Sequence, residues 1–305
     1  MADPSEIGAV WRAETRRAGK SARGLALMVL FLFAEALTLG VGGCINVGAN
    51  KQFDEIVTGQ GAEPAVVRKE LTRRKVEILK MVTRNSDATV ETLAEVPLVL
   101  LLVFFATLLF LPILIALMGF DQISAEIGPK SIRYLVVRAQ RSSVLFGKYL
   151  SQLTVLALLM VICVLAMVGV AKWLNADFEW LLAAKWAAKL WAASMVIGAT
   201  YAALTTLCSS VVRIGPLSLF LNLISLFVFW FIGLVSNVWS LPGAKGLLGQ
   251  EESPLAYIRY LLPSQFETQV LSPAPLEFAS GLVAFAGFTL VFLGLARMVL
   301  DWRDV

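Results

Sequence analysis

The sequence predicts an all-α polytopic membrane protein with six transmembrane helices. Of its 305 residues, 58% are hydrophobic and 16% are charged, whereas an ordinary soluble domain has about 25% charged residues. A helix needs roughly 20 residues to cross a bilayer core of about 30 Å, and the apolar stretches have that length. They lack the strict alternation of barrel strands, which need only about 10 residues each. The stretches lie near residues 24–45, 97–119, 145–171, 182–209, 216–238 and 278–300.

The first 23 residues precede the first span and are rich in basic side chains. Basic residues beside a span favour the cytoplasmic side of the membrane, so we expect a cytoplasmic amphipathic helix here, with its basic part at 10–20. The first span is longer than a signal-peptide core and is interpreted as a retained anchor. Six spans return the C-terminus to the cytoplasm, in a multi-pass protein of the inner (cytoplasmic) membrane. The basic residues are Arg12, Arg16, Arg17, Lys20 and Arg23.

This orientation places residues 46–95 outside the cell as an extracytoplasmic helical insertion. Within them, residues 63–82 have the pattern of an amphipathic helix, and both Glu70 with Arg74 and Arg73 with Glu77 are spaced for i,i+4 ion pairs. Two interpretations fit this helix. It is either a solvated cap on the ends of the spans or a docking face for an extracytoplasmic protein.

The second extracytoplasmic segment, residues 239–277, is rich in proline and glycine and contains an apolar run at 255–262. This composition predicts short helical pieces broken by turns, lying at or dipping into the membrane interface. Tryptophans near the same boundary are typical of an interfacial aromatic belt. They are Trp173, Trp180, Trp186 and Trp239.

Nothing in the sequence predicts catalysis by this chain. It contains no histidine, the most common general base and metal ligand. Its three cysteines, Cys44, Cys163 and Cys208, show no paired spacing and are predicted to be packing residues. The Gly19-Lys-Ser21 sequence is not a phosphate-binding loop, because Glu14 stands where that loop needs a glycine. We therefore expect no enzyme activity, no metal and no cofactor in this chain, and no nucleic-acid partner.

Residues 120–144 form a charged loop between the second and third spans. The loop opens with Asp-x-Ile-Ser-x-Glu, continues with mixed apolar and charged side chains, and leads into Arg-x5-Gly-Lys. This order resembles the first cytoplasmic loop of type-2 ATP-binding-cassette (ABC) transporter permeases, the class that includes the nitrous-oxide-reductase maturation transporter. A proline-centred element at 262–271 and a short charged tail extend the resemblance. The matching loop positions are Asp121, Ile123, Ser124, Glu126, Ile132, Arg133, Leu135, Arg141, Gly147 and Lys148.

Three features of the loop differ from the family pattern. Lys130-Ser131 replaces a frequent Gly-Thr, Arg138 replaces the usual proline, and the loop is one residue shorter. The resemblance implies a coupling helix that sits in a cleft of a separate cytoplasmic ATPase subunit, which would bind ATP and Mg. It also implies a dimer, expected to be a homodimer. The candidate coupling residues are Asp121, Ser124, Glu126, Ser131, Arg133, Arg138, Arg141 and Lys148.

The function implied is that of the permease subunit of an exporter-type ABC transporter with a hydrophobic or amphipathic substrate. An ATP-driven complex that transmits force to an extracytoplasmic partner, without transport, is the alternative. An ATP-independent channel or scaffold is a third possibility.

A few polar residues fall inside the predicted spans, in contact with membrane lipids or other spans. A carboxylate near the middle of a membrane costs several kcal/mol unless it is paired, protonated or hydrated, which makes Glu35 unexpected. Lys189 lies at nearly the same depth, so we hypothesise that Glu35 pairs with Lys189 or faces a hydrated cavity. A role in the substrate path and a protonated, lipid-facing Glu35 are the alternatives. Asn222 and Ser225 share one helix face, either for hydrogen bonds between helices or for lining the pathway.

Overall fold

The computed structural model describes residues 3–21, 24–38, 40–41, 44, 73, 76–77, 90, 93, 96, 98–127, 140–174, 180–239, 258 and 260–302. All regular structure in these ranges is helical. The long helices are α1 (Pro4–Lys20), α5 (Leu98–Gly119), α8 (Arg141–Leu174), α9 (Trp180–Val211), α10 (Gly215–Trp239) and α12 (Pro275–Trp302). The short ones are α6 (Ser124–Ile127), η2 (Pro263–Phe266) and η3 (Gln269–Leu271). A further helix runs from Gly24 to Thr38.

Five helices in these ranges are long and apolar enough to cross a membrane. The candidate spans are Val103–Ile127, Arg141–Ala166, Ala184–Val211, Gly215–Ser236 and Pro275–Trp302. A sixth is obtained only if α1 and the helix Gly24–Thr38, which meet at 68°, are taken together as one bent span. The structure is thus that of the predicted polytopic α-helical membrane protein, with five to six candidate spans.

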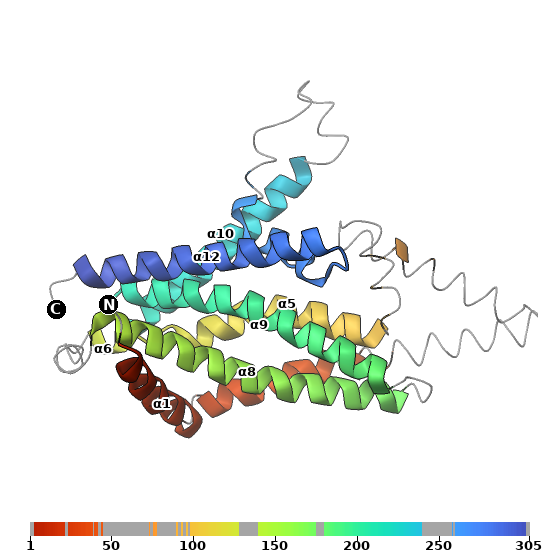
Figure 1. Cartoon of the computed structure of the whole chain (residues 1–305), viewed down its shortest axis with the longest axis horizontal. Coiled ribbons are helices and arrows are strands. Elements are labelled where there is room, and N and C mark those ends of the chain that lie inside the picture. The colour runs from red at the N-terminus through yellow and green to blue at the C-terminus, as the bar shows by residue number, and fades with distance from the viewer. Residues whose placement is uncertain are drawn as a thin grey trace, which may run out of the picture.

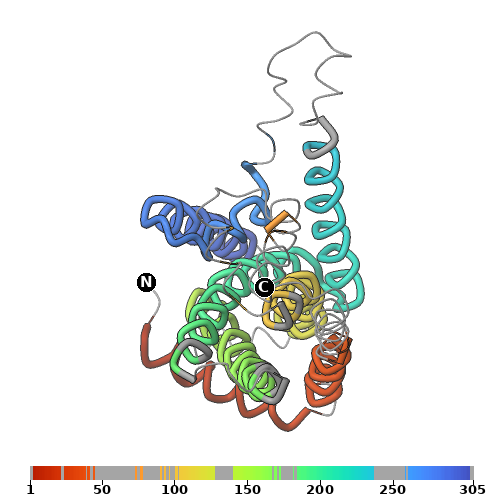
Figure 2. The backbone as a smooth tube through the Cα atoms, turned by 90° about the vertical axis from the view of Figure 1, so that its right-hand side faces the viewer, coloured from red at the N-terminus to blue at the C-terminus, as the bar shows by residue number. Residues whose placement is uncertain are grey.

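Helix α9 lies at the centre of the bundle and packs against α5, α8, α10 and α12. Its most apolar stretch is 67% buried, compared with 11% for that of α10, which lies at the edge and diverges from α12 (Figures 1 and 2). Small residues permit this packing. A Cβ atom added to Gly198 would overlap the side chain of Leu156 on α8. The apolar surface that α10 leaves exposed is what a lipid-facing helix requires.

Both described chain ends lie at one end of the bundle, beside α6, which we call the α6 end (Figure 1). Two contacts fix this arrangement. Glu6 Oε2 accepts a hydrogen bond from the backbone N–H of Gln140 at 2.9 Å. Arg141 Nη1 donates to the carbonyl oxygens of Leu300 at 2.8 Å and Asp301 at 3.2 Å. A cation at these last carbonyls of α12 also complements the helix dipole.

Helix α1 is held along the first half of α8 by close backbone approach and by side-chain hydrogen bonds. A Cβ atom on Gly147 would lie 2.7 Å from the side chain of Val10, so glycine is required for this contact. Trp11 Nε1 donates to Thr154 Oγ1 at 2.8 Å. At the start of α1, hydrogen bonds from the side chain and backbone of Ser5 hold the pKa of Asp3 below its usual value. Helix α1 is therefore an integral part of the bundle.

At the opposite end, η2 and η3 lie between α10 and α12 and are anchored to α9. Lys189 Nζ donates to the carbonyl oxygen of Leu271 at 2.7 Å. The Tyr201 hydroxyl donates to Glu267 Oε1 at 3.1 Å. Residues 240–257 and 259 of the predicted extracytoplasmic segment lie outside the described ranges.

The half-buried Glu267 side chain is expected to make stability depend on pH. Burial raises its pKa from 4.5 to about 7, against the opposing effect of the Tyr201 hydrogen bond. The folded protein therefore retains a proton that the unfolded chain releases, so stability is highest below pH 4.5 and falls as pH rises through 7. Glu267→Gln should flatten this dependence and raise stability at pH 8 by on the order of 2 kcal/mol.

Thermal unfolding in mild detergent between pH 5 and 8 measures this effect. Glu77→Gln, at a side chain that is 64% exposed, is the control and should leave the pH dependence unchanged. Equal pH dependence in the wild type and Glu267→Gln would show that Glu267 is not the group responsible.

Several other sequence predictions can be compared with the structure only in part. The i,i+4 ion pair between Arg73 and Glu77 is present, at 3.6 Å, whereas most of residues 46–95, including Glu70 and Arg74, lies outside the described ranges. Cys163 and Cys208 are buried free thiols, as packing residues should be, but Cys44 is exposed in the described part of the chain. Of the four predicted interfacial tryptophans, only the side chain of Trp186 is described, and it is buried.

Candidate functional site

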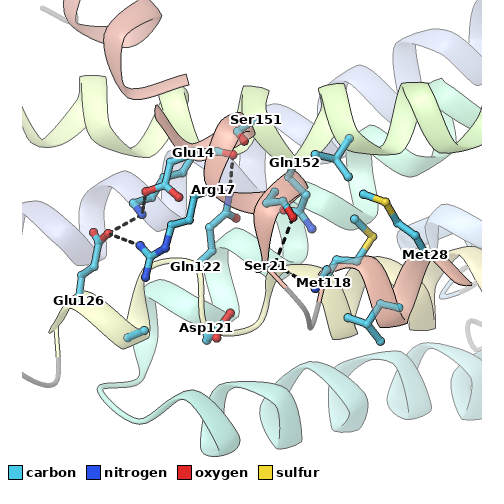
Figure 3. A pocket seen from close by; sticks show the side chains of 16 residues that line it. Glu14, Arg17, Ser21, Met28, Met118, Asp121, Gln122, Glu126, Ser151 and Gln152 are labelled. Carbon is cyan, nitrogen blue, oxygen red and sulfur yellow. Dashed lines mark hydrogen bonds and ion pairs between the residues drawn. The ribbon is translucent and has the colours of Figure 1, made fainter. Parts of the chain in front are cut away.

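The most concentrated charge cluster in the described structure surrounds Lys148, where α1, α6 and α8 meet at the α6 end. The Lys148 side chain is only 2% exposed. Its ammonium lies 2.7 Å from Glu14 Oε1 of α1 and 2.7 Å from Glu126 Oε1 of α6. Arg17 of α1, whose side chain is 73% exposed, lies 4.0 Å from the same Glu126 oxygen (Figure 3). One buried cation therefore joins three helices.

Electrostatics explains why Lys148 has two acidic partners. A buried ammonium that has lost its water is costly unless opposite charges and hydrogen bonds replace that water. Glu14 and Glu126 provide both, and neither comes from α8 itself. The position of Lys148 thus depends on α1 and α6 being docked, and their docking depends on Lys148.

The turn that leads into α6 is fixed by a second set of contacts, from α9 and α8. The Ser209 hydroxyl oxygen of α9 accepts hydrogen bonds from the backbone N–H of Ile123 at 2.9 Å and of Ser124 at 3.1 Å. The Gln122 side chain donates to the carbonyl oxygen of Lys148. Ser209 thereby satisfies buried N–H groups that α6 cannot satisfy internally. Through these contacts α6 is attached to the central helix of the bundle.

A cavity of about 250 Å³ opens beside the cluster, between α1, the helix Gly24–Thr38, the α5–α6 turn and α8. Its lining changes character from one side to the other. Glu14, Arg17 and Glu126 lie on one side, and Met28 and Met118 on the other (Figure 3). Polar side chains lie between them, namely Ser21, Asp121, Gln122, Ser151 and Gln152.

The predicted coupling residues occupy different positions in this arrangement. Glu126 and Lys148 contact each other, and Asp121 lines the cavity. Ser124 is fully buried, and Arg141 binds the end of α12. Ser131, Arg133 and Arg138 lie outside the described residues.

Sequence reasoning missed Glu14, Gln122, Gln152 and Ser209 as members of the site. In the sequence, Glu14 serves only to rule out a phosphate-binding loop. Glu14 is an acidic residue in a strongly basic segment, and this was the sequence signal that could have identified it as a member of the site. Ser209 carries no such signal, because serine is common in transmembrane helices and its partners lie 85 and 86 residues away in the sequence.

The predicted ion pair between Glu35 and Lys189 does not form. Glu35 is 3% exposed and accepts a hydrogen bond from Thr107 Oγ1 of α5 at 2.8 Å. Lys189 binds the carbonyl oxygen of Leu271 and lies 5.3 Å from the ring centre of Trp186. A similar predicted depth does not fix the face of a helix, and the two side chains face different neighbours. Glu35 is also buried within the protein and not exposed to lipid.

Asn222 and Ser225 both face α9. Asn222 Nδ2 donates to Thr205 Oγ1 at 2.7 Å. The Ser225 hydroxyl donates to the carbonyl oxygen of Leu221 at 2.9 Å and lies 4.0 Å from Cys208 Sγ. These contacts fit the interpretation of hydrogen bonding between helices, which fixes α10 on α9.

The helical bundle and the contacts of α6 define a membrane protein in which the turn that follows α5 is attached to α1, α8 and α9. Residues 9–305 match the model of the ABC-2 family transporter proteins. The chain therefore belongs to this family and is the membrane subunit of an ABC transporter. Membership implies an ATPase partner and typically a dimeric arrangement. No curated protein matches the chain.

Proposed function

We propose that this chain is the permease of an exporter-type ABC transporter and that the α6 end receives the ATPase stroke. The observation that carries this proposal is the double attachment of α6, to α8 and α1 through Lys148 and to α9 through Ser209. A stroke transmits only through elements that move as a unit. A force applied to residues 120–144 would therefore reach α1, α8 and α9 together.

The arrangement of the α6 end supports its assignment to the cytoplasm. The exposed basic side chains of α1 suit the anionic headgroups of a cytoplasmic leaflet. ATP and Mg would bind to the partner subunit, and a second copy of this chain would complete the pathway. Because Lys148 and Ser124 are buried, they would act by positioning α6. Direct contact with the ATPase would fall to residues of the segment 128–139, such as Arg133 and Arg138.

Co-purification with the ATPase subunit tests the proposal. The double charge reversal Arg133→Glu, Arg138→Glu should reduce the retained ATPase at least about tenfold, because like charges across an interface cost several kcal/mol. Arg73→Glu, a charge reversal at an exposed side chain in the predicted extracytoplasmic insertion, is the matched control and should retain the ATPase fully. The proposal fails if no ATPase subunit co-purifies, or if the double reversal retains as much as the control.

A further inference from the structure

The outer face of α1, which we define by Arg12, Arg16 and Lys20, is basic. The three side chains follow one another at intervals of four residues, so they lie on one side of the helix, and all three are exposed. The acidic side chains of Glu6 and Glu14 are half-buried and bound within the bundle. Helix α1 therefore keeps these negative charges on the side that docks and turns its positive charges away from the bundle.

No residue in the described part of the chain neutralises the outer face. Arg12, Arg16 and Lys20 take part in none of the ion pairs found there. Like charges four residues apart destabilise a helix, so this row costs stability unless anions lie against it. The helix dipole favours a cation only in the last turn, where Lys20 lies. The charges of Arg12 and Arg16 are thus left for an anion from outside the bundle.

The part of α8 that α1 covers lies just before the apolar part of α8. Hydrogen bonds from α1 and its N-cap are accepted by the hydroxyl oxygens of Ser143, Ser151 and Thr154. Residues 155–171 follow without a charged side chain and rise by about 26 Å, close to the thickness of about 30 Å of a bilayer core. Exposed side chains there, such as Leu158, suit contact with lipid tails. Helix α1 is therefore at the level of the lipid headgroups.

Helix α1 lies on the flank of the bundle. It runs along the outer side of α8 toward the helix Gly24–Thr38 (Figure 2), so its outer face points to the surrounding membrane surface. The exposed residues between the cations include Ala13 and Gly19, which are small. A helix that inserts among lipid tails carries large apolar side chains. The outer face is therefore suited to electrostatic contact with headgroups.

We infer that the outer face of α1 binds anionic phospholipids and that this binding holds α1 on α8. Arginine donates paired hydrogen bonds to phosphate oxygens, and a basic segment is attracted to a lipid surface of net negative charge. Docking on α8 holds the cations in one row at headgroup level, and a preorganised surface binds more tightly than a free segment. A ligand that prefers the docked state stabilises it.

This inference goes beyond the proposed function, because the binding needs neither the ATPase nor a substrate. It also has a consequence for α6. Helix α1 supplies Glu14 to the buried ammonium of Lys148, which Glu126 of α6 shares. Anionic lipid bound to α1 should therefore stabilise the contacts of α6.

Amide hydrogen exchange in nanodiscs tests the inference on the purified chain without the ATPase. Exchange in α1 should be slower by about tenfold in phosphatidylglycerol than in phosphatidylcholine, because bound lipid protects the docked helix. Added salt should reduce this difference. Arg12→Gln, Arg16→Gln should remove most of the difference and change exchange in phosphatidylcholine little. The control Lys185→Gln, Arg213→Gln, which neutralises two exposed cations outside α1, should retain the difference in full.

Native mass spectrometry of the chain released from mixed-lipid nanodiscs gives a second measurement. The wild type should retain phosphatidylglycerol over phosphatidylcholine, and Arg12→Gln, Arg16→Gln should lose most of this preference. Equal exchange of α1 in the two lipids overturns the inference, as does a difference in exchange or a preference in retention that Arg12→Gln, Arg16→Gln leaves intact. Slower exchange of α1 only after addition of the ATPase also overturns it, and identifies an acidic surface of that subunit as the partner of the outer face.

Discussion

Replacement of Lys148 by methionine is expected to destabilise the protein by about 3–5 kcal/mol, because removal of one partner leaves buried charges uncompensated. Glu14 and Glu126, whose side chains are 20% and 12% exposed, would then face each other without the cation between them. Methionine keeps the length and most of the volume of lysine, so the loss is mainly electrostatic. Thermal unfolding in mild detergent should show a fall in Tm on the order of 10 °C.

Two further variants separate this charge effect from a packing effect. The triple variant Lys148→Met, Glu14→Gln, Glu126→Gln removes all three charges and should recover most of the lost stability. Lys185→Met, at an exposed lysine of α9, should change Tm little. If Lys148→Met and the triple variant melt at the same reduced temperature, packing rather than charge determines the role of Lys148.

The spans were predictable because the apolar character that lets a helix lie in a membrane is a property of consecutive residues in the sequence. The predicted stretches 97–119 and 216–238 correspond to α5 (Leu98–Gly119) and α10 (Gly215–Trp239) within one or two residues. The stretch 145–171 is shorter than α8, which begins at Arg141. A helix need not end where its apolar run ends, and here the four extra N-terminal residues carry Arg141 to its contact with α12.

Contacts between distant segments were not predictable in the same way. The pairing of Glu35 with Lys189 was inferred from depth, and it fails because the partner of each side chain depends on helix rotation and on which neighbour lies beside it. The family resemblance indicated Glu126 and Lys148 as coupling residues, but Glu14 lies 134 residues from Lys148 in the chain. Its approach depends on the glycine at position 147, which admits Val10 of α1. A pattern in a single sequence does not show that two distant segments contact each other.

Replacement of Ser209 by valine is expected to release α6 from α9. Valine has a methyl group in place of the hydroxyl and adds a second methyl group, so it leaves no cavity but removes the oxygen that accepts from Ile123 and Ser124. Each buried N–H without a partner costs about 1–3 kcal/mol, so the two together should destabilise the docked turn by about 2–6 kcal/mol. Amide hydrogen exchange over residues 120–127 measures this directly, and exchange there should become faster in Ser209→Val.

The neighbouring serine provides the matched control. Ser210 is equally buried, but its hydroxyl donates only to the carbonyl oxygen of Leu207 within α9, so Ser210→Ala should leave exchange in residues 120–127 unchanged. Unaltered exchange in Ser209→Val would show that the contacts of Ser209 do not hold α6. If both attachments are needed to transmit the stroke, Ser209→Val should retain the ATPase on co-purification but lower the response of the permease to ATP. Loss of the response without loss of the ATPase therefore separates transmission through the bundle from recognition of the partner.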